Sequence, residues 1–353
     1  MVKLIETVYN FLWGDLLTVP LPGGGTLPLS LLVILLIPTG VYFTIRTKFL
    51  PIRLFKDMVG ALFEKKGEEQ SALSVIQTLI VSTATRVGMG NLVGVVAAIS
   101  AGGAGAVFWM WITALIGSST AFIEATLSQI YKEKDPLYGG YRGGPAYYIH
   151  RYFEEKSGKK KRYVLLSVLF AISGLICWCG ISQVVSNSVS EAFQNAFSIP
   201  PLVTTLVLTA LAAVIVLRKE ATVKSLDVMV PIMAGCYFVM TLWIILTHLP
   251  QLPGVFVRIF SEALGLRQAV GGGFGAVVMN GIKRGLFSNE AGMGSTPNAH
   301  AQANVAHPCQ QGQVAIVSVF IDTILVLNMT AFVIIGTKML EPGSPAYVDG
   351  KLL

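Results

Sequence analysis

Residues 71–101 place the strongest constraint on the fold, because they are apolar enough to lie in a bilayer and yet are interrupted by polar residues and glycines. The interruption contains two glycines and an arginine, which disfavour a continuous helix. It reads Thr85-Arg86-Val87-Gly88-Met89-Gly90-Asn91. We therefore expect two half-helices joined by unwound backbone at membrane depth.

Unwound backbone persists in a membrane only where protein buries it or where it lines a cavity. Many secondary transporters build a binding site in this way, with freed carbonyls for a cation and half-helix amides for an anionic group. The alternative is a helix whose glycines only let a neighbour approach closely. Arg86 and Asn91 favour a binding site, because both side chains are costly in lipid.

Composition assigns the whole chain to the integral membrane proteins, since 53% of its 353 residues are hydrophobic and only 13% are charged. The expected fold class is all-α, a polytopic helix bundle. Eight apolar segments have about the length that a transmembrane helix needs. They are residues 28–46, 71–101, 104–131, 163–189, 201–217, 226–248, 268–300 and 313–337.

The loops between these segments carry the charge that orients the chain. Residues 46–66, 132–162 and 218–224 hold 18 of the 26 lysines and arginines, and all three loops fall on one side if each segment crosses once. Positive loops face the cytoplasm, so the N-terminus is expected outside the cell membrane. The net charge of +7 lies in these loops and predicts a bilayer partner, with no nucleic acid.

The topology divides the chain into four regions. Residues 1–27 form an N-terminal interfacial segment, with a short in-plane helix or a frayed tail in its first 20 residues. Residues 28–70 hold a peripheral span and a basic cytoplasmic loop. Residues 71–248 form a first repeat of five spans, and 249–353 hold an in-plane helix and a partial second repeat.

The two glycine-interrupted spans run in opposite directions, which indicates inverted repeats with a site between them. Residues 71–101 run outward and contain Gly88-Met89-Gly90-Asn91. Residues 268–300 run inward and contain Gly292-Met293-Gly294-Ser295. The second repeat has two spans, so we expect it to be incomplete and the chain to be truncated at its C-terminal end.

Several motifs in order along the chain resemble the alanine/glycine:cation symporter family. They are Gly88–Val95 (GMGNLVGV), Gly105–Trp111 (GAVFWMW), Gly143–Tyr148 (GGPAYY), Lys283–Gly292 (KRGLFSNEAG) and Phe320–Thr323 (FIDT). The resemblance implies the leucine-transporter fold and sodium-coupled symport of a small neutral amino acid, alanine or glycine, by alternating access. It implies a transporter in place of an enzyme, with sodium as coupling ion and no other cofactor.

Sodium coordination is expected at the first interruption, because a sodium ion prefers oxygen ligands. By analogy with the leucine-transporter fold, the carbonyls of Ala84 and Val87 and the side-chain oxygen of Asn91 would bind it. The amides of Met89 and Gly90 would bind the substrate carboxylate at a half-helix N-terminus. Asn91 has a second interpretation as an N-cap.

The substrate pocket is expected to use further residues from two other spans. Phe287 would form an apolar wall, and Asn289 lies in the polar kink that follows it. The family glutamine implied in substrate contact stands at Val185 here, with Gln183 two residues away. The family pattern also has threonine at Met89, so this chain departs from it at two pocket positions.

Ionisable residues inside the spans are expected to hold structural or gating roles, because buried charges must pair or be neutralised. Arg86, Lys283 and Arg284 face a small set of acids, and the sequence leaves their pairing open. These acids are Glu124, Asp227, Glu290 and Asp322. Gly88 is also expected to have a structural or gating role. The turn Gly143-Gly144-Pro145 is expected to make a gate contact, by family recurrence, with a partner that is not identified.

Other functions have less support. His300 and His307 lack further metal ligands, and the cysteines have no metal-ligand spacing. The alternative to transport is an incomplete, transport-inactive fragment or a regulatory membrane protein of the same family. A passive channel would not need paired broken helices.

Overall fold

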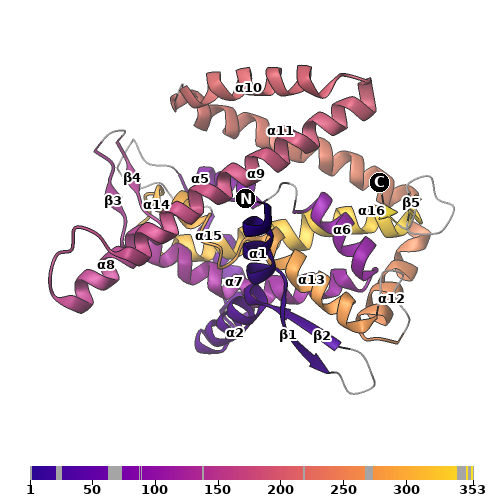
Figure 1. Ribbon diagram of the computed structural model, residues 1–353, viewed down its shortest axis with the longest axis horizontal. Helices are drawn as coiled ribbons and strands as arrows, with labels where there is room; N and C mark the ends of the chain where they lie inside the picture. Colours follow the sequence, from indigo (N-terminus) through magenta and orange to yellow (C-terminus); the bar gives the residue numbers. More distant parts are fainter. Residues whose placement is uncertain are drawn as a thin grey trace.

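The structure, a computed structural model, is built mainly of helices and confirms an all-α polytopic membrane fold (Figure 1). It describes residues 2–20, 26–62, 74–86, 88, 90–136, 139–217, 219–266, 273–339, 347–348 and 351–352. Within these residues four helices are long and apolar enough to cross a membrane. They are Ala106–Ile130, Leu165–Phe197, Val228–Thr247 and Pro308–Gly336.

The N-terminal region holds a helix and a hairpin before the first span. Helix α1 (Val2–Leu12) is followed by the antiparallel strands β1 (Asp15–Pro20) and β2 (Thr26–Ser30), with Leu17 opposite Leu29. Helix α2 (Leu31–Arg46) begins directly after β2. A helix is therefore present in the first 20 residues and ends at Leu12, while its in-plane orientation stays a prediction. The sequence did not predict the hairpin, because its strands are stabilised by pairing and by contact with a distant helix.

The first interrupted span is two helices, α5 (Val75–Arg86) and α6 (Val93–Gly102). Between them Gly88, Gly90 and Asn91 are non-helical, as predicted. Short helices α3 (Leu50–Arg53) and α4 (Phe55–Ala61) lie in the basic loop before it.

Helix α7 (Ala106–Ile130) is the centre of the packing and contacts α2, α6, α13 and α15. Small residues let its neighbours approach closely. A Cβ atom added to Gly281 of α13 would lie 2.5 Å from the carbonyl oxygen of Ala106, and one added to Gly285 would overlap Thr113 Oγ1. The apolar core around α7 includes Val95, Ile99, Val107, Met110 and Leu327.

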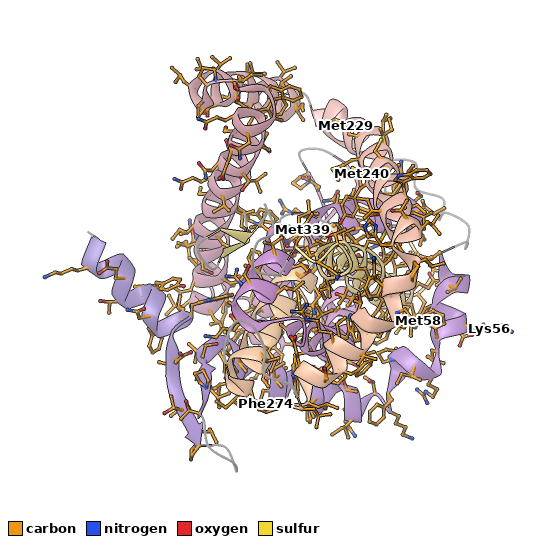
Figure 2. All side chains as sticks on the ribbon, turned by 90° about the vertical axis from the view of Figure 1, so that its right-hand side faces the viewer. Lys56, Met58, Met229, Met240, Phe274 and Met339 are labelled. Carbon is orange, nitrogen blue, oxygen red and sulfur yellow. The ribbon has the colours of Figure 1, made fainter. Side chains whose placement is uncertain are left out.

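After α7 the chain leaves this core and returns to it. The hairpin β3 (Glu133–Lys134) and β4 (Tyr141–Arg142) leads into α8 (Pro145–Ser157). Helices α9 (Leu165–Phe197), α10 (Pro201–Leu217) and α11 (Lys219–Thr247) then form an arch on one side of the molecule (Figures 1 and 2). In the most apolar stretches of α9 and α11, only 6% of the residues are buried, as suits helices whose surface faces lipid.

The last part of the chain holds the second interrupted span. A 3₁₀ turn, η1 (Leu249–Gln251), leads into α12 (Leu252–Ala263), where an in-plane helix was predicted. Helices α13 (Phe274–Asn289) and α14 (Pro297–Ala301) flank the second interruption. Helix α15 (Pro308–Phe320), a π-helical turn η2 (Ile321–Val326) and α16 (Leu327–Gly336) form one continuous span, and β5 (Tyr347–Val348) pairs with β6 (Lys351–Leu352).

Candidate functional site at the two interrupted helices

The two interrupted spans meet at Gly90 and Ser288. A Cβ atom added to Gly90 would lie 2.9 Å from Ser288 Cα, closer than ordinary packing allows. Gly90 therefore permits a backbone-to-backbone approach that a side chain would prevent. The contact brings the end of α13 beside the unwound segment between α5 and α6.

A buried polar cluster forms where these segments touch the π-helical turn. Ser288 Oγ donates to Asn91 Oδ1 across 2.6 Å and lies 3.3 Å from Asp322 Oδ2, and the Asn91 amide nitrogen donates to Asp322 Oδ1. Thr323 Oγ1 lies 3.0 Å from Asp322 Oδ2. We call Asn91, Ser288, Asp322 and Thr323 the Asn91–Asp322 cluster. All four side chains are fully buried.

The π-helical turn explains how Asp322 and Thr323 both reach this cluster. A π turn widens the helix by one residue, and such turns recur at functional sites. Asp322 and Thr323 are the buried residues of η2, whereas Ile324 and Leu325 of the same turn are exposed. The local register thus aims two neighbouring oxygen-bearing side chains inward.

The chemistry of the cluster suits an alkali cation. It offers the side-chain oxygens of one amide, two hydroxyls and one carboxylate. The backbone carbonyl oxygen of Arg86 is also close by, 3.4 Å from the Asn91 amide nitrogen. No group of three or more His, Cys, Asp or Glu side chains that could hold a metal ion occurs within the described residues. Oxygen ligands of low total charge are those that pores and transporters use for sodium and potassium.

Arg86 lies beside the cluster and connects α5 to the second interruption and to α15. Its guanidinium donates to Thr296 Oγ1 across 3.0 Å and to the Ala315 carbonyl oxygen across 3.2 Å, and it lies 3.4 Å from Ser82 Oγ. The side chain is 2% exposed, and its Nε has no hydrogen-bond partner. Within the described part of the chain its contacts are to neutral oxygens, so it forms none of the ion pairs that the sequence left open.

His300 extends this polar network and is fully buried. Its Nε2 lies 3.1 Å from Ser82 Oγ and its Nδ1 lies 2.8 Å from Gln311 Oε1. His307, in contrast, caps α15 by accepting a hydrogen bond from the Cys309 amide. Both histidines therefore have structural partners.

The predicted intramembrane charges have separate partners. Glu124 Oε2 accepts a hydrogen bond from the Gly292 amide across 2.9 Å, which ties α7 to the second interruption. Lys283 donates to Asp15 Oδ1 across 2.9 Å and so binds the N-terminal hairpin to α13. Glu290 accepts a hydrogen bond from Ser295 Oγ.

The other predicted site residues are placed as follows. Ala84 is half-buried at the end of α5, whereas Val87 and Met89 lie outside the described residues. Phe287 is half-buried, and Asn289 is buried beside Gly117 of α7, with its amide nitrogen unpartnered. These assignments stay predictions.

Gln183 and Val185 are not brought to the cluster in this conformation. Both side chains are exposed on α9, and the helices that α9 contacts most are α8 and α10. Their predicted role in substrate contact also stays a prediction.

Sequence reasoning missed Ser288 and Thr323 as members of the site and gave Asp322 only a structural or gating role. The signal was available in part, since both hydroxyl residues lie within motifs that had been singled out, Lys283–Gly292 and Phe320–Thr323. Only the π turn and the contact at Gly90 show that these residues converge.

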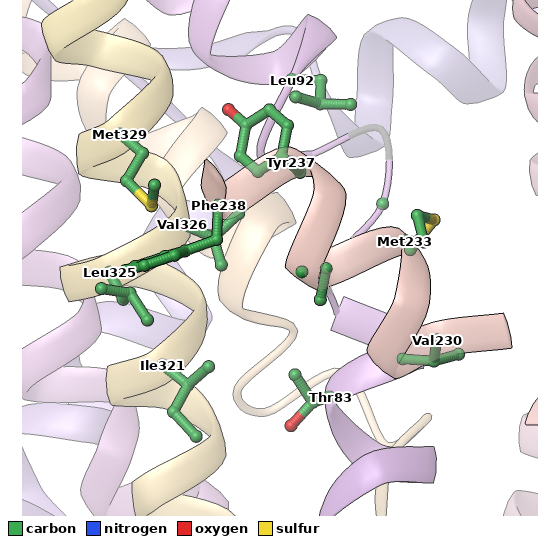
Figure 3. Close-up of a pocket in the computed structure, with 13 residues that line it drawn as sticks. Thr83, Leu92, Val230, Met233, Tyr237, Phe238, Ile321, Leu325, Val326 and Met329 are labelled. Atoms are coloured by element: carbon green, nitrogen blue, oxygen red, sulfur yellow. The ribbon is translucent and has the colours of Figure 1, made fainter. Parts of the chain in front are cut away.

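A cavity of about 410 Å³ adjoins the first interruption (Figure 3). Gly88 and Leu92 line one side of it, and Met233, Tyr237 and Met329 line others. Tyr237 hydroxyl is hydrogen-bonded to Thr330 Oγ1, which joins α11 to α16. The lining is almost wholly apolar, so the cavity could accept an apolar group beside the unwound backbone.

The turn at Gly143–Pro145 packs against the second interruption and α14, whereas its expected role in a gate stays a prediction. Gly144 has a φ of 118°, and a Cβ atom there would overlap Asn298 Oδ1 of α14. A Cβ atom on Gly143 would lie 2.8 Å from that of Ala301. Both glycines are therefore required for close docking of the α8 turn on α14.

Comparisons with known proteins agree with a transporter. The sequence model of the sodium:alanine symporter family matches residues 23–350. The chain is 43% identical over 311 residues to the probable sodium/glutamine symporter GlnT of Bacillus subtilis, covering 87% of this chain and 63% of the relative. It is 42% identical to the amino-acid carrier protein AlsT of the same organism, covering 85% and 63%.

A more distant relative covers more of both chains. The sodium/alanine symporter AgcS of Methanococcus maripaludis is 34% identical over 337 residues, covering 94% of this chain and 70% of the relative. The chain thus spans 63% of the length of each of the two Bacillus subtilis relatives named above.

Proposed function

Because the chain belongs to the sodium:alanine symporter family, we propose that it carries out sodium-coupled symport of a small neutral amino acid across the cell membrane by alternating access. The observation that carries this proposal is the Asn91–Asp322 cluster, where three segments far apart in the sequence present buried oxygen atoms to one another. The N-terminus lies outside in this proposal, as the basic loops require.

The cluster is the proposed sodium site. Sodium would bind the side-chain oxygens of Asn91, Ser288 and Asp322, together with the carbonyls predicted at Ala84 and Val87. One carboxylate balances the charge of a monovalent cation, while the neutral oxygens replace its water shell. The relatives named for sodium and an amino acid support this choice of ion.

Coupling would follow from where the ion binds. The cluster joins the first interruption, the end of α13 and the π turn, so a bound cation stabilises one arrangement of all three. An amino acid that contacts the same arrangement gains affinity from the ion, and the ion gains the same factor from the amino acid. Met89 and Gly90 amides would bind its carboxylate, with Phe287 and Asn289 beside it.

The amino acid is proposed to be alanine or glycine. One relative is named for glutamine and another for alanine, so the uptake experiment includes both the larger and the smaller amino acid. Val185 and Gln183 are proposed to affect selectivity when α9 approaches the site.

Uptake into vesicles tests the proposal. The full chain is reconstituted, and uptake of radiolabelled alanine, glycine and glutamine is measured with an inward sodium gradient, with a proton gradient and with neither. We expect the sodium gradient to drive accumulation, with alanine or glycine preferred. Uptake that ignores every cation gradient would overturn coupling.

A charge-neutralising variant locates the sodium site. Asp322→Asn keeps the shape and removes the carboxylate charge, so the sodium concentration for half-maximal uptake should rise about tenfold or more. Asp57→Asn, on the exposed surface of α4, is the matched control and should leave it unchanged. Equal sodium dependence of both variants would remove Asp322 from the site.

A further inference from the structure

A second cavity, of about 650 Å³, lies between α9, α2 and the loop that joins α13 to α14. Its walls are mainly apolar and include Leu36 from α2 and Phe170 and Trp178 from α9. This volume falls within the range of small-molecule sites in proteins. No member of the Asn91–Asp322 cluster lines it, so it is distinct from the proposed sodium site.

Glu290 lines this mainly apolar cavity. Glu290 directly follows α13 with a φ of 51°, in the left-handed region that residues other than glycine rarely adopt. Non-glycine residues in such conformations cluster at ligand sites, where the surrounding structure holds them. Here Glu290 lines the same cavity as Phe170 and Trp178.

Within the described part of the chain, Glu290 has one hydrogen-bond donor and forms no ion pair. Ser295 Oγ donates to Glu290 Oε2 across 2.5 Å. The ion pairs within the described residues involve other acids, namely Asp15, Glu133, Glu154 and Glu262. A carboxylate at membrane depth is costly unless a positive charge and further donors accompany it.

An ammonium group would give Glu290 an ion pair and further hydrogen bonds, because it carries one positive charge and several N–H donors. The apolar walls favour a ligand whose remaining part is hydrocarbon. From this juxtaposition we infer that the cavity binds a ligand with a primary ammonium group and a short apolar body. The ammonium contacts Glu290, and the apolar body packs against Phe170 and Trp178.

Cys177 lines the same cavity and serves as a reporter. The full chain, with Cys179, Cys236 and Cys309 replaced by serine, is reconstituted in vesicles of phosphatidylcholine and phosphatidylglycerol. The rate at which the neutral reagent methyl methanethiosulfonate modifies Cys177 is measured against increasing n-butylammonium. We expect saturable protection by n-butylammonium and none by n-butanol at the same concentrations.

Variants separate the charge from the shape of the loop. Glu290→Gln keeps an acceptor for Ser295 and removes the charge, so n-butylammonium should protect about tenfold less well. Ser295→Ala leaves the carboxylate and should retain protection. Glu191→Gln, exposed elsewhere on α9, is the matched control and should behave as the parent.

Three outcomes would overturn the inference. They are absence of protection, equal protection by n-butanol, and unchanged protection in Glu290→Gln. If Glu290→Gln fails to fold, the comparison of n-butylammonium with n-butanol on the parent decides the matter.

Two sources of ammonium are distinguished by further arms. Alanine, with and without sodium, tests whether the transported amino acid occupies the cavity. Vesicles that contain phosphatidylethanolamine test whether a lipid amine does. Sodium-driven uptake is measured separately, so the ammonium site can fail while the proposed transport function stands.

Discussion

Ser288 Oγ donates a hydrogen bond to Asn91 Oδ1 across 2.6 Å, although the two residues are 197 positions apart in the chain. The bond joins the two interrupted spans at the depth where both lose helical structure. Asp322 accepts from the same asparagine and lies within reach of the same serine, which adds a third segment. Changes at this junction should therefore alter ion binding more than membrane insertion.

Asn91→Leu removes a side-chain oxygen from the junction and keeps the side-chain size. We expect normal insertion and a rise of about tenfold or more in the sodium concentration for half-maximal uptake, since one contact to a charged group is lost. Sodium titration of uptake measures this. Asn195→Leu, exposed on α9, is the control, and a parent-like sodium affinity in Asn91→Leu would contradict the assignment.

Gly90→Ala tests the close approach of the two spans. The new methyl group would lie 2.9 Å from Ser288 Cα, so the spans must separate and the Asn91–Asp322 cluster must open. We expect the free energy of unfolding to fall by about 1–3 kcal/mol and sodium binding to weaken. Gly60→Ala in α4 has no atom within 4 Å and should be neutral or slightly stabilising, so similar losses in both variants would refute the steric explanation.

Arg86→Met should lower the free energy of unfolding by about 2–3 kcal/mol, because buried acceptors lose their donor. The affected groups are Thr296 Oγ1 and the Ala315 carbonyl oxygen. Arg86→Lys keeps the charge but cannot reproduce the planar fork of the guanidinium, so its free energy of unfolding should lie between those of the parent and of Arg86→Met. Thermal unfolding in detergent measures the series, with the exposed Arg162→Lys as control, and an unchanged midpoint in Arg86→Met would show that the network contributes no stability.

Gly144→Ala should destabilise the docking of the α8 turn on α14. The methyl group would overlap Asn298 Oδ1, and φ of 118° disfavours any side chain. Gly158→Ala is the control, because its φ is also positive but no atom lies within 4 Å. We expect a larger drop in thermal midpoint for Gly144→Ala, partly recovered by adding Asn298→Ala. Absence of recovery would assign the loss to backbone strain alone.

Val185→Gln restores the residue type that the family resemblance implies at this position. If α9 approaches the substrate during transport, selectivity among alanine, glycine and glutamine should change by up to about 1–2 kcal/mol for one buried hydrogen bond. Competition uptake assays measure this. Val184→Gln is the neighbouring control, and identical selectivity in both would place residue 185 outside the substrate path.

The amino-acid sequence by itself determined the membrane class and the break in the first interrupted span. Apolar runs of span length and the glycines at 88 and 90 act locally, through hydrophobic burial and helix propensity, so they can be interpreted without a partner. Asn91 was predicted as a site residue because a polar side chain is costly in lipid, and its role as a sodium ligand came from the analogy with the leucine-transporter fold. The hairpin at residues 15–30 was not predicted, because β1 and β2 depend on each other and on α13.

Only the tertiary structure decided which polar residues meet. Asp322 and Thr323 join Asn91 because a π turn shifts the register of their span. Ser288 joins them because Gly90, which has no side chain, lets the end of α13 approach closely. The sequence also left the partners of Arg86 open, and the structure supplies neutral oxygens in place of a carboxylate. Composition and periodicity show that a charge must be satisfied, whereas the packing of segments hundreds of residues apart decides which atoms satisfy it.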